Sequence, residues 1–276
     1  MNQFKRSENE IMTTQTTLNL TGKRAIISAG ASGIGLGIAR AIVRAGGRVH
    51  VCDVNKDMLA SLAASDPTIT TSVANVSDSA AVDRMFDEGI EALGGLDILV
   101  NNAGIAGPTK LIEDIGDEEW RQTLEVNLTG QFYCTRRAVP LFKKARAGSI
   151  VNLSSMAGVM GLPMRAPYVA AKWAVIGVTK TLAMELGEYG IRVNAICPGN
   201  VEGERMEQVL AAEAAALNID PQVLRHNYNK HTSLRTYVSA NDIANMVVFI
   251  CSDLGSRISG QALQVDGHME TLIARD

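Results

Sequence analysis

The sequence is poor in aromatic residues and in cysteine. Phenylalanine, tryptophan and tyrosine together make up 4% of the 276 residues. The four cysteines lie far apart along the chain: Cys52, Cys134, Cys197 and Cys251. This spacing fits neither a disulfide framework nor a metal-ligand pattern, so we expect no metal site. Small buried thiols in a reducing compartment are the simplest interpretation.

The sequence also lacks an excess of charge and a long apolar run. Its formal net charge is -3, with both signs mixed along the chain, which argues against nucleic acid and membrane surfaces as partners. The longest stretch without charge, 147–164, contains Asn152 and Pro163 and is unsuited to a membrane helix. Residues 1–17 are polar and contain no apolar signal-peptide core, so we expect a flexible lead-in, with Met12 as the original start, and a cytoplasmic location.

Short apolar runs alternate with longer helical patterns along the rest of the chain. The runs are nearly continuous in apolar residues, as in parallel strands buried on both faces: 24–29, 48–54, 70–76, 96–102, 149–155, 191–197 and 262–266. The helical patterns between them cover 33–45, 56–64, 78–93, 117–145, 166–187 and 240–253. We predict an α/β, doubly wound Rossmann fold, with a seven-stranded, mainly parallel sheet and helices on both faces. No linker divides residues 18–276, so we expect one domain there.

Residues 199–237 break this alternation with a polar, helix-like segment where a short connection would suffice. We interpret the segment as a substrate lid. Its second half, 221–236, carries basic residues and no acid. A solvated helix face explains this composition more simply than attraction of an anionic or polyhydroxylated substrate, which stays the alternative. The same two interpretations apply to Arg165.

A glycine-rich turn follows the first predicted strand. Gly30, Gly33 and Gly35 lead into a helix, and Asp53 ends the second strand 18 residues beyond Gly35. Such a turn presents backbone N–H groups and the positive end of a helix dipole to phosphates. An acid at about this spacing binds ribose hydroxyls in dinucleotide-binding sheets. We therefore predict that 18–276 is an NAD-binding catalytic domain.

Asp53 also favours NAD over NADP. Its carboxylate can accept hydrogen bonds from both adenosine ribose hydroxyls, whereas it would repel a 2′-phosphate. No arginine or lysine stands within 27–39, and Lys56 is the nearest cation in sequence to Asp53.

Tyr168 and Lys172 are four residues apart on a predicted helix and therefore share one face. An ammonium near a phenol lowers the pKa of the phenol from its ordinary value of about 10. A tyrosine tuned in this way can take a proton from an alcohol or return one to an alkoxide.

Taken together, these motifs resemble the classical short-chain dehydrogenase/reductase family from Leu20 to Gly267. The resemblance rests on several motifs in order: the glycine turn, NNAG at 101–104, VNLTG at 126–130, a Ser-Tyr-Lys set, PG at 198–199 and SGQALQVDG at 259–267. It implies an NAD-dependent oxidoreductase that interconverts a small polar secondary alcohol (a sugar, polyol or hydroxy acid) and its ketone by hydride transfer.

The resemblance also implies a role for each site residue. Tyr168 is the general acid and base, Ser155 binds the substrate oxygen, Lys172 tunes Tyr168 and binds ribose, and Asn127 holds a water of the proton relay. Ser154 instead supports the backbone. The implied cofactor-binding residues are Ser28, Gly30, Ser32, Gly33, Ile34, Gly35, Asp53, Asn75, Val76, Asn102, Ala103, Gly104, Tyr168, Lys172, Pro198, Gly199 and Val201.

Three positions depart from the family pattern. Ala29 stands where the family's turn has its first glycine, and alanine tolerates such a turn only if its φ stays negative. We expect the turn to survive, slightly altered, with cofactor binding intact. Gly203 replaces a threonine that contacts the nicotinamide carboxamide, so that contact is lost or replaced. Asn75 replaces an acid and can still hydrogen-bond adenine.

Two alternatives to this function stay open. One is an NADPH-type carbonyl or ketoacyl reductase, against which Asp53 argues. The other is a non-enzymatic, dinucleotide-sensing regulator, against which the complete set of Asn127, Ser155, Tyr168 and Lys172 argues.

The resemblance further implies a homotetramer. The helices predicted at 117–145 and 166–187 carry more apolar positions than one sheet face needs, including Phe132, Trp173 and Val175.

Overall fold

The computed structural model describes residues 18–269, which form a sheet of seven parallel strands. The strand order is β3-β2-β1-β4-β5-β6-β7. The strands are β1 (Arg24–Ser28), β2 (Arg48–Asp53), β3 (Ile69–Val73), β4 (Ile98–Asn101), β5 (Gly148–Leu153), β6 (Ile191–Pro198) and β7 (Ala262–Val265). The predicted fold class is confirmed, and every strand pair is parallel. The expected lead-in at 1–17 lies outside the described residues.

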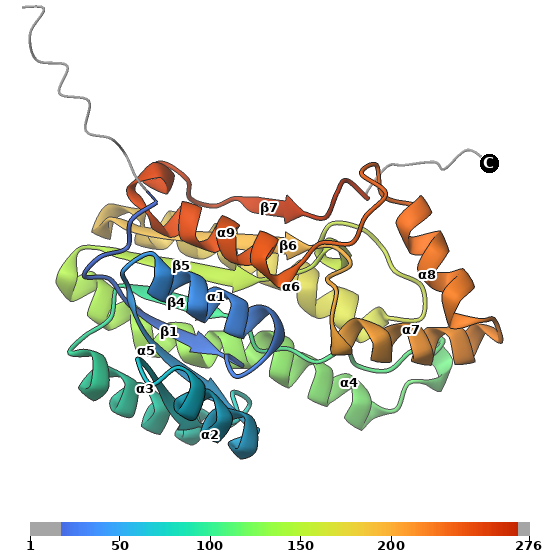
Figure 1. Cartoon of the computed structure of the whole chain (residues 1–276), viewed down its shortest axis with the longest axis horizontal. Helices are drawn as coiled ribbons and strands as arrows, with labels where there is room; N and C mark the ends of the chain where they lie inside the picture. Colours follow the sequence, from blue (N-terminus) through green and yellow to red (C-terminus); the bar gives the residue numbers. More distant parts are fainter. Residues whose placement is uncertain (1–17, 270–276) are drawn as a thin grey trace, which may run out of the picture.

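Helices cover both faces of the sheet (Figure 1). The helices are α1 (Gly33–Arg44), α2 (Lys56–Ser65), α3 (Ser79–Leu93), α4 (Asp117–Leu124), α5 (Gly130–Ala145), α6 (Ala166–Leu186), α7 (Glu204–Leu217), α8 (Pro221–Lys230) and α9 (Ala240–Cys251). One apolar core lies under α1, α2 and α9, and a second lies under α3, α5 and α6. The inner strands and β2 are buried on both faces by these two cores, which explains their nearly continuous apolar sequences, whereas the edge strands β3 and β7 are partly exposed.

Local sequence signals set several helix ends. Ser239 and Asp242 form a capping box at the start of α9, as the sequence indicates. Gly94 ends α3 in the left-handed conformation, with φ of 74°. The helix predicted at 117–145 is not continuous, because a π-helical turn at Glu125–Thr129 separates α4 from α5. A π turn inserts one residue more than an α turn, so it changes the direction in which the following side chains point.

The strand order reverses between β1 and β4, which are neighbours in the sheet although β2 and β3 intervene in the chain. In such sheets, ligands bind beyond the carboxyl ends of the strands at this reversal. Figure 1 shows α7 and α8 at the end of the sheet toward which the strand arrows point. The fold thus brings the predicted lid and the predicted glycine turn to the same edge of the sheet.

The surfaces of α5 and α6 differ partly from expectation. Phe132 and Trp173 are 53% and 51% exposed, so their rings face outward in the single chain. We predicted that Val175 lies outside the core and is covered by another subunit, but it is 1% exposed in the single chain and belongs to the core. It is buried because the α6 face that carries it turns toward the sheet.

The described residues also bear on membranes and metals. Within residues 18–269, no helix combines the length and apolar character that crossing a membrane requires. In that same range, no group of three or more His, Cys, Asp or Glu side chains could hold a metal ion. All four cysteines are buried and reduced.

A buried polar cluster joins β2 to β3 and α3. His50 is 2% exposed, and its two ring nitrogens lie 2.9 Å from Thr70 Oγ1 and 2.8 Å from Ser72 Oγ. Ser72 Oγ donates to Glu88, so Ser72 accepts from Nε2–H of His50 and Nδ1 accepts from Thr70. Burial lowers the pKa of His50 to about 4, despite the opposing charge of Glu88. The imidazole is therefore neutral in the folded chain at neutral pH.

We predict that His50 weakens the fold at acid pH. Between about pH 6.5 and pH 4, the unfolded chain binds a proton at His50 that the folded chain does not bind, so the free energy of unfolding falls as pH falls. The expected loss from His50 between pH 7 and pH 5 is about 2 kcal/mol. Urea unfolding of the wild type and of His50→Gln at both pH values measures it. Equal pH dependence in the two proteins would contradict the prediction.

Candidate active site

The turn between β1 and α1 has the close backbone packing that only glycine allows. A Cβ on Gly30 would lie 2.5 Å from Cβ of Val51, and one on Gly35 would lie 2.2 Å from the carbonyl oxygen of Ala29. The Ser32 side chain makes no capping hydrogen bond, and the first turn of α1 carries no acidic residue. The described chain therefore leaves the positive end of this helix dipole uncompensated beside Gly33 and Ile34, which suits an anion.

Ala29 corrects one expectation about this turn. Its φ is +51°, in the left-handed region, whereas we expected a negative value. Asn102 Nδ2 donates to the carbonyl oxygens of both Ser28 and Ala29, at 3.0 and 2.9 Å, and holds the turn in this shape. The turn therefore keeps its shape, but Ala29 is strained, because the Cβ of an L-residue crowds the backbone in the left-handed region.

Ser28 ties the end of β1 to the segment after β4. Its Oγ accepts hydrogen bonds from the backbone N–H groups of Asn102 and Ala103, each at 3.0 Å. The predicted cofactor residues from these two neighbouring strands are thus bound to each other. They form one rigid border of the site at the strand-order reversal.

Asp53 lies beside the glycine turn, as its spacing indicates. Its Oδ2 accepts from the Ala31 N–H at 3.3 Å, and its Oδ1 accepts from the Asn55 N–H at 3.1 Å. Among the described residues, no cation forms an ion pair with Asp53, and Arg40, which directly follows the segment 27–39 in sequence, is paired at 2.7 Å with Asp66. Two backbone N–H groups therefore bind the carboxylate, but no described cation neutralises it.

Asn75 and Val76 follow β3 on the same side. Asn75 is exposed, and its Oδ1 accepts from the backbone N–H and the hydroxyl of Ser77. Val76 is 5% exposed and packs against Gly130, where a Cβ would approach within 2.7 Å. Val76 thus joins β3 to α5.

Tyr168, Lys172 and Ser155 come together at the carboxyl end of β5. Tyr168 and Lys172 stand one turn apart on α6, with Lys172 Nζ 5.6 Å from the centroid of the tyrosine ring. Lys172 is 3% exposed, and its Nζ donates to the Leu153 carbonyl oxygen at 2.8 Å. The Ser155 hydroxyl is close enough to Tyr168 to contribute to lowering the pKa of the phenol, and it also accepts from the Ala157 N–H at 3.2 Å. As expected, Ser154 instead donates to the Lys172 backbone oxygen at 2.8 Å.

The charges around Tyr168 outweigh its burial. Burial raises the pKa of the phenol, but Lys172, Arg205, the hydrogen bond from Ser155 and Arg165 together lower it below its ordinary value of 10. Burial also lowers the pKa of Lys172, and Arg205 adds to that shift while Tyr168 opposes it. Both groups can therefore exchange protons closer to neutral pH than the same side chains in water.

Asn127 owes its position to the π turn. The residue is fully buried, and its Nδ2 donates to the carbonyl oxygens of Ile105 and Thr123 at 3.0 and 2.9 Å. Its Oδ1 is buried without a hydrogen-bond partner. A Cβ on Gly104 would lie 2.6 Å from this Oδ1 and 3.5 Å from Lys172 Nζ. The unpartnered acceptor and the ammonium therefore border the same glycine.

The predicted lid begins immediately after β6. Pro198 is buried at the strand end, and a Cβ on Gly199 would lie 2.7 Å from the Asp266 Cα. Val201 forms a parallel bridge with Val238, which joins the two ends of the lid. Gly203 has φ of +136°, so the threonine of the family pattern would be strained there.

The lid consists of α7 and α8, and its cations have two different environments. Arg225 of α8 pairs with Glu207 of α7 and lies 5.2 Å from the Tyr237 ring centroid. Arg205, in the first turn of α7, donates from Nη1 to the Gly104 carbonyl oxygen at 3.0 Å. Arg205 is not among the site residues predicted from the sequence, where its only distinguishing feature is a positive charge at the start of a polar helical segment.

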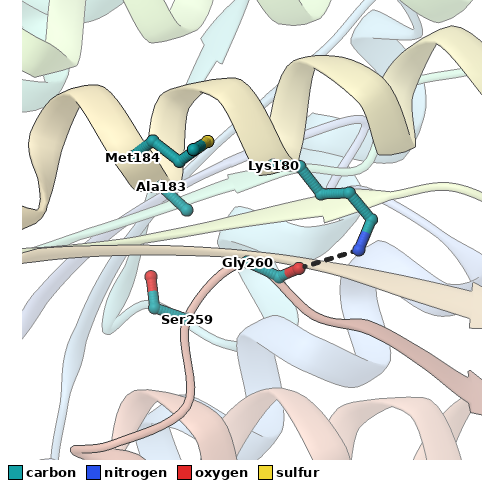
Figure 2. Close-up of a pocket in the computed structure, with 5 residues that line it drawn as sticks. All are labelled: Lys180, Ala183, Met184, Ser259 and Gly260. Atoms are coloured by element: carbon teal, nitrogen blue, oxygen red, sulfur yellow. Dashed lines mark hydrogen bonds between the residues drawn. The ribbon is translucent and has the colours of Figure 1, made fainter.

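A surface hollow elsewhere on the chain contains none of the predicted site residues. It lies between α6 and the segment before β7, and Lys180 Nζ donates to the Gly260 oxygen across it at 3.3 Å (Figure 2). The predicted site residues instead gather around Tyr168 at the carboxyl edge of the sheet, and this region is the candidate active site.

Comparison with known proteins agrees with this geometry. A family model described as enoyl-(acyl carrier protein) reductase matches residues 28–269. The chain belongs to the short-chain dehydrogenase/reductase family. Members of this family bind a nicotinamide dinucleotide and act on alcohol or ketone groups.

Similar proteins differ in cofactor and substrate. D-beta-hydroxybutyrate dehydrogenase of Rhizobium meliloti is 33% identical, over 89% of this chain and 97% of that protein. The structure of NAD+-bound xylitol dehydrogenase matches with a TM-score of 0.86 and 30% identity, over 90% of this chain and 98% of the other. A variant of actinorhodin polyketide ketoreductase with NADPH also matches with a TM-score of 0.86 and 30% identity, over 89% and 96%.

We predict that Ala29→Gly stabilises the protein. Glycine adopts a φ of +51° without the strain that alanine bears, although it gains more freedom in the unfolded chain. The expected net gain is about 0.5–1 kcal/mol in the free energy of unfolding, measured by urea titration without cofactor. Gly35→Ala is the reverse control and should destabilise strongly, because its Cβ would overlap the Ala29 oxygen. If Ala29→Gly instead lowered the free energy of unfolding, the inference that Ala29 is strained would be wrong.

Proposed function

We propose that this protein is an NAD-dependent oxidoreductase that interconverts a small polar secondary alcohol, of the sugar, polyol or hydroxy acid class, and its ketone. The observation that carries the proposal is the lowered pKa of Tyr168 beside the buried Lys172. A phenol with these neighbours is suited to act as general acid and base on an alcohol or ketone oxygen.

The chain's own residues fit a dinucleotide. The uncompensated first turn of α1, at Ser32, Gly33, Ile34 and Gly35, suits the pyrophosphate, and Asp53 suits the adenosine ribose. The adenine would lie near Asn75 and Val76. The remaining contacts would come from Ser28, Gly30, Asn102, Ala103, Gly104, Tyr168, Lys172, Pro198, Gly199 and Val201. When bound, the nicotinamide supplies the two-electron acceptor or donor.

Four residues would move and hold the proton. In alcohol oxidation, the Tyr168 phenolate takes the hydroxyl proton while Ser155 hydrogen-bonds the same substrate oxygen. The Lys172 ammonium stabilises the phenolate by its charge. A water between Lys172 and the unpartnered Asn127 Oδ1 would then return the proton to solvent. In ketone reduction, the same groups deliver a proton to the oxygen.

Asp53 supports NAD as the cofactor. A 2′-phosphate placed at the adenosine ribose would face a carboxylate that no described cation neutralises, and Arg40 is held by Asp66. The alternative is an NADPH-type carbonyl or ketoacyl reductase, and the similarity to a ketoreductase with NADPH is the observation that favours it. A dinucleotide-sensing regulator would not need the lowered pKa of Tyr168.

The proposal extends to the whole molecule. Residues 18–276 would act as one catalytic domain, with 199–237 as its substrate lid, in a cytoplasmic protein. The exposed Phe132 and Trp173 support a homotetramer that covers these rings between subunits.

We predict that kcat/KM is higher with NAD than with NADP. Asp53→Ala removes the repulsion of a 2′-phosphate, so the ratio of the two kcat/KM values should approach one, while Asp53→Asn tests the charge alone. Absorbance of the reduced nicotinamide measures both cofactors on a panel of sugars, polyols and hydroxy acids. Equal or better use of NADP by the wild type would show that the cofactor assignment is wrong.

We predict that Tyr168→Phe lowers turnover by about 10²–10⁴ and leaves cofactor affinity nearly unchanged, because it removes only the phenolic oxygen. Lys172→Met should weaken cofactor binding as well. The rate of alcohol oxidation by the wild type should rise with pH through an apparent pKa below 10, since the phenolate is the base. Tyr189→Phe is the matched control, since this ring packs against Lys143 away from the site. Near-full turnover in Tyr168→Phe would overturn the mechanism.

A further inference from the structure

We propose that Arg165 and Arg205 bind a carboxylate of the substrate, which makes the substrate a short hydroxy acid and the product a keto acid. The inference rests on the proposed function and narrows its substrate class. It comes from two guanidinium groups that no carboxylate of residues 18–269 holds in an ion pair.

Arg165 is a buried cation with an unused donor. Its side chain precedes α6 and is 4% exposed, with its Cζ 5.2 Å from the Tyr168 ring centroid. Nη2 donates to the Ala106 carbonyl oxygen at 2.8 Å, whereas Nε is buried with no hydrogen-bond partner. Burial of a guanidinium whose N–H group has no hydrogen-bond partner costs free energy unless another group supplies an acceptor. The described chain supplies neither an acceptor for Nε nor a carboxylate for the charge, so an anionic ligand beside the guanidinium would offset part of this cost.

Arg205 brings a second cation to the same place from the lid. It donates to Gly104, the glycine that also borders Asn127 and Lys172. Its charge lowers the pKa of both Tyr168 and Lys172, which places it within electrostatic reach of the reacting groups. Arg165 and Arg205 therefore act on one site from two different elements.

The one carboxylate whose charge acts on Arg165 already has a different partner. Glu213 of α7 accepts a hydrogen bond from the Tyr228 hydroxyl at 2.5 Å, and together with burial this raises the pKa of Tyr228. Glu213 makes no ion pair with Arg165. Three cations, Lys172, Arg165 and Arg205, thus surround Tyr168 with one carboxylate at longer range, which leaves the site positive.

The chemistry of the cations selects the ligand. Neighbouring N–H groups of a guanidinium match the two oxygens of a carboxylate, and such charge-assisted bonds are the strong ones. A neutral polyol would leave the positive charge of the two guanidinium groups without a counter-charge. Because Arg165 packs on the Tyr168 ring, the carboxylate would lie only a few bonds from the carbinol carbon.

The reaction balances without further reactants. The carbinol O–H proton passes to Tyr168, and the carbinol hydrogen with its bonding electron pair passes to the oxidised dinucleotide. The C–O single bond becomes a carbonyl. The carboxylate keeps all its bonds, so one hydroxy acid gives one keto acid, one reduced dinucleotide and one proton.

The first experiment compares short 2- and 3-hydroxy acids with their methyl esters and with neutral polyols on the wild-type enzyme. We expect kcat/KM for the best acid to exceed that for its ester by about 10-fold or more. An ester or a polyol used equally well or better would overturn the carboxylate assignment and leave the proposed function standing.

The second experiment uses substitutions. Arg165→Gln and Arg205→Gln should each lower kcat/KM for the acid by about 10- to 100-fold more than for the ester, with the additional loss mainly in KM. Both substrates lose the effect of these cations on the pKa of Tyr168, but only the acid also loses a partner for its carboxylate. Arg165→Lys should recover part of the loss. Arg225→Gln is the matched control, because Glu207 already neutralises that lid cation. Equal losses for acid and ester would show that these arginines only tune Tyr168, and would overturn the inference.

A binding measurement separates the two proposals. If no alcohol reduces either dinucleotide, the proposed function fails, and calorimetry with a short keto acid and the enzyme–NADH complex still tests the site. Binding that is lost in Arg165→Gln, with unchanged thermal melting, supports the carboxylate site. Absent binding, or equal binding in the variant, overturns it. An inorganic phosphate that competes as strongly as the keto acid would also contradict a carboxylate-specific site.

Discussion

The hydrogen bond from Lys172 to the Leu153 carbonyl fixes the centre of this structure. It joins α6 to the carboxyl end of β5 and holds an ammonium at a position that is almost free of water. A buried cation is expensive, and the cost is offset only by partners close at hand. One partner is the Leu153 oxygen and another is the phenol of Tyr168. The position of α6 beside β5 and the pKa of the phenol both depend on this arrangement.

The sheet makes that arrangement stable by supplying rigid borders. Ser28 binds the backbone beyond β4 from the end of β1, and Asn102 returns two hydrogen bonds to the glycine turn. Asn127 gives its amide protons to two backbone oxygens and keeps its own oxygen free. These three side chains are therefore held by backbone groups, and Asn127 keeps an acceptor available beside Gly104. Holding them in this way reduces the conformational freedom that a ligand would otherwise have to restrict.

Sequence patterns identify those parts of this structure that depend on local spacing. Buried parallel strands follow from continuous apolar runs, and the shared face of Tyr168 and Lys172 follows from their separation by four residues. The roles of Ser154 and Ser155 are implied by the family resemblance and not by local spacing, and the hydrogen bond from Ser154 to the Lys172 backbone oxygen agrees with the role expected of Ser154.

The remaining features depend on tertiary contacts. A helical pattern over 117–145 cannot show one inserted residue, so the π turn at 125–129 is invisible in the sequence. The intrinsic preference of alanine for negative φ is overridden at Ala29 by the hydrogen bonds of Asn102 and the close approach of Gly35. Arg205 reaches Gly104 only because α7 packs back over the sheet edge. Exposed and buried arginines look alike in a sequence, and packing alone distinguishes Arg165 from Arg225.

The distribution of charge along the carboxyl edge of the sheet is the last consequence of this packing. Among residues 18–269, Asp53 has no ion-pair partner at the end of β2. Lys172 and Arg165 lie beyond β5, and Arg205 joins them from the lid. A ligand that spans the edge therefore meets a negative group at one end and positive groups at the other. Because charges in a partly buried site are poorly screened, this polarity acts on the orientation of a ligand as well as on its affinity. Under the two proposals, it would oppose an added phosphate beside β2 and favour an anionic group beside Tyr168, and the same cations lower the pKa of the phenol. Substrate charge and proton transfer would then be coupled, because a bound carboxylate would partly cancel the field that lowers the pKa of Tyr168.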